Sequence, residues 1–352
     1  MTSLSKAFVF LVTATSISAC VTLDETFEPA PPVIPSKTNV APPSVTLGIE
    51  RYMEQRTHVE SVGFRLRKAA NQECHRVGKS KADLGIEVWS LANFPNPEDQ
   101  QRLRASYSLT NAVTVAIAAK SGPAHAAGLA AGDVVASVNG EEIPAGIGAT
   151  ERFISLSNQA AKQGRVIIGL ANGRSYAINP VSICEHPALL VRSPETNAAA
   201  DGTSVAITTA LYDVTQSDDE LALVLGHELA HNVLNHLKQG QDTPPKSGRL
   251  LDALLRSSIS AALTSQATPP HSQAKEREAD HVGLYIMARA GFDVSSAERL
   301  WAHLSRSTNA SLLAKTHPSA PDRLAAIRQT TEEIRAKQNS GQPLNFPLTP
   351  HQ

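Results

Sequence analysis

Apolar residues recur along the chain with two different spacings, which predict a mixture of strands and helices. Short apolar runs at 113–119, 165–170 and 174–179 have the length and the flanking turn residues of β-strands. Longer stretches repeat apolar residues at the helical spacing, and they lie at 150–163, 217–231, 275–290, 294–306 and 321–338. Because these stretches dominate the C-terminal half, the sequence predicts an α+β fold with an α-rich second half.

The first 47 residues differ from the rest of the chain. An apolar run at 7–19 follows Lys6 and has the length of a signal-peptide core, too short to cross a bilayer. It ends in Ile-Ser-Ala-Cys at 17–20, which resembles a bacterial lipobox and implies that residues 1–19 are removed and that Cys20 carries a lipid. An ordinary signal peptide with an incidental cysteine is the alternative.

The segment 20–47 contains six prolines and almost no large apolar side chains. Such a composition predicts an extended tether rather than a folded domain. Val21 stands where an aspartate would retain an enterobacterial lipoprotein at the inner membrane, so the outer membrane is the expected destination.

Composition narrows the classes of partner. Lys and Arg number 32 against 33 Asp and Glu, a net charge of −1, so no excess of positive charge is available to bind nucleic acid. No stretch reaches the roughly 20 apolar residues that a membrane helix needs. We therefore expect a chain that meets the membrane through lipidated Cys20.

Besides Cys20, the chain has two cysteines, Cys74 and Cys184. Two remaining cysteines in a compartment that permits disulfides are expected to pair. We therefore predict a disulfide between them, with two separate buried thiols as the alternative.

Between these cysteines, residues 121–140 read Ser-Gly-Pro-Ala-His-Ala-Ala-Gly-Leu-Ala-Ala-Gly-Asp-Val-Val-Ala-Ser-Val-Asn-Gly. This stretch resembles a bacterial PDZ domain, with a short helix that ends at Gly128 and a tight hairpin turn at Asn139-Gly140. The resemblance implies an inserted α/β domain over 85–180 that binds an extended peptide as an added strand. The loop that holds a terminal carboxylate is not evident here, and a spacer or dimer contact is the alternative role.

The segment that ends at His231 carries the clearest chemistry. Ser-Asp-Asp-Glu at 217–220 matches a capping box, and the following Leu-Ala-Leu-Val-Leu-Gly-His-Glu-Leu-Ala-His is apolar on nearly every side, so a buried helix is expected. Histidines and a glutamate in such a helix need partners or a metal. His227 and His231 lie one turn apart and can take two corners of a zinc tetrahedron. Glu228 can then act as general base on a water at the metal.

A second helix, predicted at 275–290, begins with Glu-Arg-Glu-Ala-Asp at 276–280. Glu276 and Asp280 lie one turn apart on one side, whereas Glu278 points away by about 200°. We therefore expect Glu276 as the third metal ligand and Asp280 as the hydrogen-bond partner of His227. A solvated acidic face is the alternative.

His236 is not expected to supply a ligand, and two other features near these helices have separate roles. His236 is nine positions beyond His227 and about half a turn out of phase with it, and His281 is expected on a flank of the second helix. The intervening segment 239–273 is expected to hold an amphipathic helix over 249–263, which is either a lid over the cleft or a helix packed on the body.

The motifs HELAH at 227–231 and EREAD at 276–280, with Thr-His-Pro at 316–318 and Arg323, together resemble the gluzincin metallopeptidase family of the CAAX prenyl protease, HtpX and the periplasmic chaperone-protease BepA. The resemblance covers about 195–330. It implies an α-rich zincin-type metallopeptidase domain with a small edge-strand sheet. That domain would comprise residues 48–84 and 181–352, interrupted by the PDZ-like domain.

The family pattern, carried over by position, implies one zinc ion and assigns roles around it. The expected metal ligands, catalytic base and supporting residues are His227, His231, Glu276, Glu228, Asp280 and Arg323. His317 matches a family histidine near the metal that closes the site in some periplasmic members; a capping or surface histidine is the alternative. The family also implies an edge strand at 203–209 where substrate backbone pairs. Ala199 departs from the large aromatic residue that is common in the family, which leaves the shape of the cleft open.

These inferences predict a lipid-anchored zinc endopeptidase on the periplasmic side of the bacterial cell envelope that cleaves unfolded or misassembled envelope proteins. The PDZ-like domain would deliver protein or peptide segments to the cleft, and the envelope assembly machinery is an expected partner. The alternative hypothesis is a chaperone or peptide-binding lipoprotein whose zinc site is held shut by His317.

Overall fold

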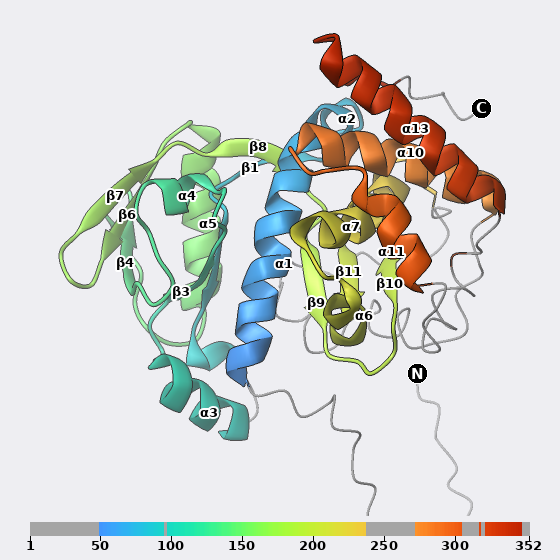
Figure 1. Ribbon diagram of the computed structural model, residues 1–352. Helices are drawn as coiled ribbons and strands as arrows, with labels where there is room; N and C mark the ends of the chain where they lie inside the picture. Colours follow the sequence, from blue (N-terminus) through green and yellow to red (C-terminus); the bar gives the residue numbers. More distant parts are fainter. Residues whose placement is uncertain (1–48, 95–96, 237–271, 305–316, 318–320, 347–352) are drawn as a thin grey trace, which may run out of the picture. The chain divides into compact units, whose positions relative to one another are not determined.

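The computed structural model describes residues 49–94, 97–236, 272–304, 317 and 321–346 (Figure 1). Helices and strands both contribute, which confirms the predicted α+β class. The predicted signal peptide, lipidated cysteine and tether at 1–47 and the predicted helix at 249–263 lie outside the described residues. In the part of the chain that is described, no helix combines the length and the apolarity needed to cross a bilayer.

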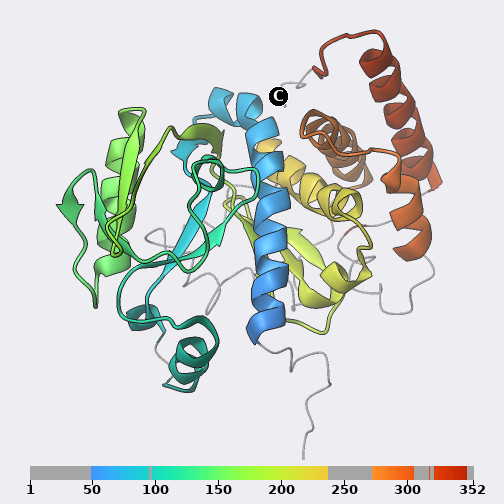
Figure 2. The ribbon, with the colours of Figure 1, turned by 60° about the vertical axis from the view of Figure 1, so that its left-hand side comes forward.

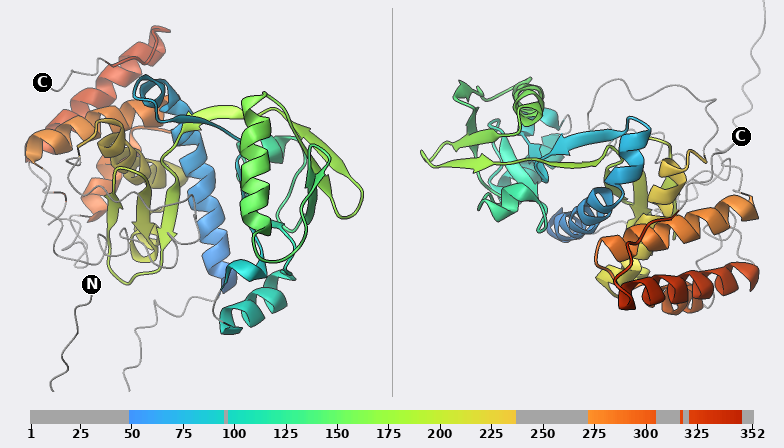
Figure 3. Two further views of the ribbon diagram at one scale, coloured as in Figure 1. Left: turned by 180° about the vertical axis from the view of Figure 1, so that it is seen from behind. Right: turned by 90° about the horizontal axis from the view of Figure 1, so that it is seen from above.

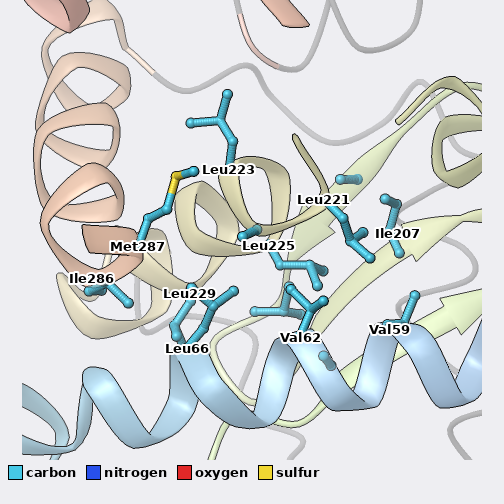
Figure 4. Close-up of a cluster of buried hydrophobic side chains, with 14 of the residues drawn as sticks. Val59, Val62, Leu66, Ile207, Leu221, Leu223, Leu225, Leu229, Ile286 and Met287 are labelled. Atoms are coloured by element: carbon cyan, nitrogen blue, oxygen red, sulfur yellow. The ribbon is translucent and has the colours of Figure 1, made fainter. Parts of the chain in front are cut away.

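The larger hydrophobic core joins three helices, α1 (Ile49–Ala69), α7 (Asp218–Val233) and α10 (Gln273–Arg289). Figure 4 shows the side chains that meet between them, with α1 running below α7 and α10. Full burial of each such side chain contributes about 1.5–3 kcal/mol, so the two helices that carry the predicted metal ligands are held together by the core. The fully or nearly fully buried members include Val59, Val62, Leu66, Ile207, Leu221, Leu225, Leu229, Ile286 and Met287.

Helix α7 begins as its sequence predicts. The hydroxyl of Ser217 accepts a hydrogen bond from the backbone N–H of Glu220, and the Glu220 carboxylate accepts one from the backbone N–H of Gln216. These contacts satisfy backbone donors at the start of the helix. The carboxylates in its first turn also complement the helix dipole.

A three-stranded sheet packs against α7, and Figure 2 shows it beside α1. Its order is β10 (Ala198–Ala200), β11 (Val205–Thr208) and β9 (Ala188–Val191), with β10 antiparallel and β9 parallel to β11. The predicted edge strand at 203–209 is therefore wrong, because β11 is the central strand and β10 forms the edge. All four residues of β11 are buried, as expected for a strand with neighbours on both sides.

The remaining helices complete the C-terminal half. α6 (Thr209–Val214) leads from β11 towards α7, and α11 (Ser296–Leu304) contacts α7 and α13 (Pro321–Asn339). Helix α13 runs beside α10, which the view from above in Figure 3 displays most clearly. This packing brings the start of α13 to the start of α10.

A second hydrophobic core coincides with the predicted insertion except for its first member, and it draws its members from Leu84 to Ile178. A four-stranded antiparallel sheet has the order β5 (Glu141–Glu142), β4 (Val135–Val138), β6 (Val166–Leu170) and β7 (Ser175–Ile178). A separate pair joins β2 (Ile86–Trp89) to β3 (Thr114–Ala118). The helices of this part are α3 (Pro97–Tyr107), α4 (Pro123–Ala126) and α5 (Ala149–Lys162), with a short 3-10 turn η2 (Leu91–Asn93).

The predicted turn between β4 and β5 has the expected geometry. Asn139 and Gly140 both have positive φ, at 50° and 83°, as a two-residue turn of type I′ requires. Leu129, which follows the short helix α4, is buried in the second core. These features agree in order with the PDZ-like pattern, whose identification for 85–180 stays a prediction.

Two antiparallel strands and a disulfide close the base of this part of the chain. β1 (Ser80–Asp83) pairs with β8 (Val181–Cys184), so the chain enters and leaves side by side. Cys74, in α2 (Asn71–Arg76), is bonded to Cys184, with their Cα atoms 5.4 Å apart. The bond joins residues 110 positions apart.

Candidate metal centre

Helix α7 presents three functional side chains from a buried position. The side chain of His231 is fully buried, that of Glu228 is 2% exposed and that of His227 is 12% exposed. The Nε2 atoms of the two histidines lie 3.1 Å apart, as the four-residue spacing predicts. The Nε2 atoms of the two histidines therefore point towards the same place.

A close helix crossing brings α10 to this point. Gly226 on α7 faces Gly283 on α10, and a Cβ atom at position 283 would lie 3.0 Å from the carbonyl oxygen of Gly226 and from the backbone nitrogen of His227. Only glycine allows the two backbones to approach so closely. The crossing places Glu276, at the start of α10, beside both histidines.

Four donor atoms converge at the crossing, from His227, His231, Glu276 and His317, and all lie within 4.8 Å of one another. Each carboxylate oxygen of Glu276 lies 3.4 Å from the Nε2 atom of one α7 histidine. Zinc bonds of about 2.0–2.1 Å in a tetrahedron separate neighbouring ligand atoms by about 3.4 Å. The residues present therefore fit a single zinc ion in both chemistry and spacing.

A buried network of polar contacts supports these donor residues. The Nδ1 atom of His227 lies 2.9 Å from Oδ1 of Asp280, the arrangement expected for the partner of a metal-binding histidine. Arg323, on α13, donates two hydrogen bonds of 2.8 and 2.9 Å to Asp280 and contacts Oε2 of Glu276 at 2.9 Å. Arg323 thus holds both carboxylates of α10 in place.

The electrostatics of the site favour a cation. Burial alone would lower the pKa of His227, but hydrogen bonds and charge from Asp280 and Glu276 outweigh it and raise the pKa to about 10. Burial would raise the pKa of Glu276, whereas its histidine partners lower that pKa below its usual range. The negative field that favours a proton on His227 also favours a metal ion at the same place.

Glu228 has the properties of a general base. Burial raises the pKa of its carboxyl, opposed by His317, His227 and the backbone N–H of Ala200 in β10. Its Oε2 atom is buried and has no hydrogen-bond partner among the described residues. A buried carboxylate with an unused oxygen can accept a proton from a neighbouring water molecule.

His317 lies inside the site. Its Nδ1 atom is 3.2 and 3.3 Å from the two oxygens of Glu276, and its Nε2 atom is 3.3 Å from Oε1 of Glu228. The side chain is 5% exposed. The ring therefore stands between the carboxylates of Glu228 and Glu276.

His236 and Glu278, which were not expected to be metal ligands, lie beside His231 on the side away from the metal cluster. His236 is not in the metal cluster, but its Nδ1 atom lies 3.0 Å from Nδ1 of His231. Its Nε2 atom lies 3.2 Å from Oε2 of Glu278, the carboxylate that points away from Glu276. His281 instead contacts Thr330 through its Nδ1 atom, on the flank of α10.

The turn between β10 and β11 is fixed to the helix that carries the histidines. The side-chain amide of Asn232 donates to the carbonyl oxygen of Ser204 at 2.8 Å and accepts from the backbone N–H of Gly202 at 2.7 Å. Residues of β10 and α7 also lie in contact. The edge strand is therefore held in register beside the histidine-bearing helix.

Two histidines and a glutamate that converge on one point are a donor set typical of catalytic zinc sites. Residues 177–331 match the model of peptidase family M48. The match supports the predicted family and the predicted enzyme class.

Named relatives agree with this class. The mitochondrial metalloendopeptidase OMA1 of Schizosaccharomyces pombe is 27% identical over 186 residues, which are 47% of this chain and 53% of that protein. The beta-barrel assembly-enhancing protease of Escherichia coli K12 is 29% identical over 167 residues, 42% of this chain and 34% of that protein. The chain thus spans about half or less of the length of these relatives.

Proposed function

We propose that the protein is a zinc-dependent endopeptidase in which His227, His231 and Glu276 hold one zinc ion and Glu228 is the general base. The observation that carries the proposal is the spacing of the three donors, 3.1 to 3.4 Å between neighbouring atoms, beside a buried glutamate. The match to a peptidase family over 177–331 supports it independently.

The residues divide the work of hydrolysis among them. A zinc ion held by His227, His231 and Glu276 would supply Lewis-acid chemistry, polarising the scissile carbonyl and making the attacking water more acidic. Glu228 removes a proton from that water and later delivers it to the leaving nitrogen. Asp280 holds His227 in the tautomer with a proton on Nδ1, which leaves Nε2 available as a ligand. The edge of β10 that has no strand partner among the described residues is the place where we propose that the substrate backbone pairs.

We propose that His317 keeps this site latent. Its ring contacts both Glu228 and Glu276, so a substrate carbonyl and its attacking water cannot occupy that space until the ring moves. The active population is then only the fraction of molecules with His317 displaced.

We propose that residues 85–180 form a PDZ-like, peptide-binding domain. A cavity of about 500 Å³ lies between β2 and α5. Among the described residues β2 pairs with β3 alone, which leaves its second edge facing this cavity. Apolar side chains line this cavity, among them Ile86, Val88, Phe153, Ile154 and the fully exposed Ile147.

The loop before β2 favours an internal segment of a polypeptide over a free C-terminus. The backbone N–H of Gly85 donates to Oδ1 of Asp83 at 2.7 Å, so this amide is already used. The one cation lining the cavity among the described residues, Lys81, is paired with Asp83 at 2.9 Å. A terminal carboxylate would therefore meet a carboxylate rather than an available donor.

Location and partners complete the proposal. We propose that the chain is a lipoprotein anchored through Cys20 on the periplasmic side of the outer membrane, where it acts on unfolded or misassembled envelope proteins and works beside the assembly machinery. The lipobox-like sequence and the similarity to a beta-barrel assembly-enhancing protease support this location. Loss of palmitate labelling in Cys20→Ser would support the anchor, and unchanged labelling would contradict it.

A chaperone with a latent zinc site is the second candidate function. The contact between His317 and Glu228 favours it, because a site closed at rest binds without cutting. A deletion phenotype rescued by Glu228→Gln would support chaperoning, whereas failure of rescue would support proteolysis.

The test of the endopeptidase is cleavage of casein by the full chain with and without a chelator. Glu228→Gln should retain zinc and lose cleavage. Glu220→Gln is a matched control, because Glu220 is also buried on α7 but contacts the backbone of Gln216 rather than the metal cluster. Unchanged cleavage by Glu228→Gln would reject the mechanism.

A further inference from the structure

We infer that His236 and Glu278 are positioning residues for His231, forming a hydrogen-bonded chain that fixes the orientation and tautomer of this metal ligand. The inference rests on the proposed zinc site. It assigns a role to two residues that supply no ligand atom to the metal cluster.

The end of α7 explains how His236 reaches His231. The helix ends at Val233, and Asn235 follows in the left-handed conformation with φ of 54°. Asparagine adopts this conformation more readily than most residues. The chain then turns back, and the backbone N–H of His236 donates to the carbonyl oxygen of His231 at 2.9 Å. The two imidazoles are thereby stacked edge to face, with ring centres 5.0 Å apart.

With a metal at Nε2 of His231, these contacts imply a position for each proton. His231 turns its Nε2 atom to Glu276 and His227, and a neutral histidine that offers Nε2 to a metal carries its proton on Nδ1. That proton can be donated to Nδ1 of His236, 3.0 Å away. His236 must then carry its own proton on Nε2, which faces the Glu278 carboxylate at 3.2 Å.

The hydrogen-bonded chain of His236 and Glu278 is anchored on α10, the helix that also supplies the third proposed ligand. Glu278 lies two residues after Glu276 on α10, and Lys275 on the same helix donates to the carbonyl oxygen of His236 at 2.5 Å. His236 is 3% exposed, so its ring has little freedom to leave this position.

Each histidine ligand is thus linked by hydrogen bonds to a carboxylate of α10, one directly and the other through a second imidazole. His227 contacts Asp280 directly at 2.9 Å, whereas His231 reaches Glu278 through the ring of His236. Partners of this kind raise the basicity of the ligand and hold its ring, and their loss weakens metal binding.

The test measures zinc affinity of the full-length protein by competition with a chromophoric chelator. His236→Phe keeps the ring volume but removes both nitrogens, and its zinc Kd should rise roughly 10–100-fold. Glu278→Gln keeps an acceptor without the charge, and its Kd should rise by less. The visible absorption bands of the Co²⁺-substituted protein should shift in His236→Phe, because the geometry of His231 changes.

The control is His186→Phe, which also removes a buried imidazole. His186 contacts the carbonyl oxygen of Thr203 and lies outside the metal cluster, so its zinc Kd and cobalt spectrum should match the wild type. If His236→Phe does not fold, Glu278→Gln and Glu278→Ala carry the test. Wild-type Kd and spectra in the variants would overturn the inference. A wild-type protein that binds no zinc would instead contradict the proposed function.

Discussion

Gly283 of α10 packs directly against Gly226 of α7, at the level of the first histidine of the site. A methyl group at Gly283 would press on the backbone of α7 at 3.0 Å, whereas one at Gly226 would meet the carbonyl oxygen of Gly283 at 3.3 Å. Helices α7 and α10 can therefore lie this close together because each has a glycine at the crossing, where any larger side chain would push them apart.

Gly283→Ala should consequently destabilise the protein although alanine favours helices. The helix preference would contribute about 1 kcal/mol, and the forced separation of two packed helices costs about 1–3 kcal/mol or more. Urea unfolding measures the free energy change, and chelator competition should show weaker zinc binding. Gly226→Ala should have a smaller effect on both; a larger effect from Gly226→Ala would contradict this account of the crossing.

His317→Ala should increase casein cleavage by the full chain several-fold. The change removes the ring that lies 3.3 Å from the proposed base, and the open site becomes the major population. His281→Ala is the control, since His281 contacts Thr330 on the flank of α10 and should leave cleavage unchanged. Reduced cleavage in His317→Ala would show that the ring assists the reaction rather than blocks it.

Asp83→Asn should lower stability at neutral pH but not in acid. Burial would raise the pKa of Asp83, but Lys81, Arg67 and the N–H of Gly85 together lower it below its usual range. A lowered pKa means that the ionised form stabilises the fold above the unfolded-state pKa and that this contribution disappears as the pH falls through the folded-state value. At pH 7 the loss should be about 1.5–3 kcal/mol, the range for hydrogen bonds to charged groups.

Urea unfolding at several pH values checks this prediction. The difference in free energy of unfolding between wild type and Asp83→Asn should disappear as the pH falls below the usual pKa range of aspartate. Glu141→Gln is the control, because the pair of Glu141 and Arg152 is exposed and 3.5 Å long, and such pairs contribute little. A gap of constant size at all pH values would exclude the ion pairs as its cause.

Removal of the bond between Cys74 and Cys184 should destabilise the fold by about 2–5 kcal/mol, because the bond closes a long loop. The double variant Cys74→Ser, Cys184→Ser should unfold at lower urea concentration than the oxidised protein. Dithiothreitol should shift the wild type towards the variant and leave the variant unchanged. Equal unfolding midpoints for all samples would contradict a stabilising disulfide.

The helices of the site could be predicted because local signals agree with the global fold. Ser217 caps α7 where the capping box indicates, and the spacing of His227 and His231 places their rings together. Glu276 and Asp280 occupy the side of α10 that their spacing predicts. These relationships depend on helix geometry alone.

The position of His236 could not be predicted from helix geometry. A phase calculation assumes that α7 continues, but the helix ends at Val233 and Asn235 reverses the chain. The signal was the asparagine just beyond the last apolar position, a residue typical of a left-handed turn at a helix end.

Long-range pairing accounts for the other differences. The family resemblance implied an edge strand at 203–209, but β9 pairs with β11 on its second side. This pairing could not be predicted locally, because β9 is separated from β11 by β10 and two turns, and a parallel partner leaves no local signature. The contact between Gly226 and Gly283 likewise joins two helices whose crossing no local pattern encodes.

The most direct test of the central claim is an anomalous diffraction map of the zinc-loaded crystal recorded at the zinc absorption edge. The account predicts a single peak within about 2.0–2.2 Å of Nε2 of His227, Nε2 of His231 and a carboxylate oxygen of Glu276. A zinc-loaded protein with no peak between these three side chains, or with its peak elsewhere, would contradict it.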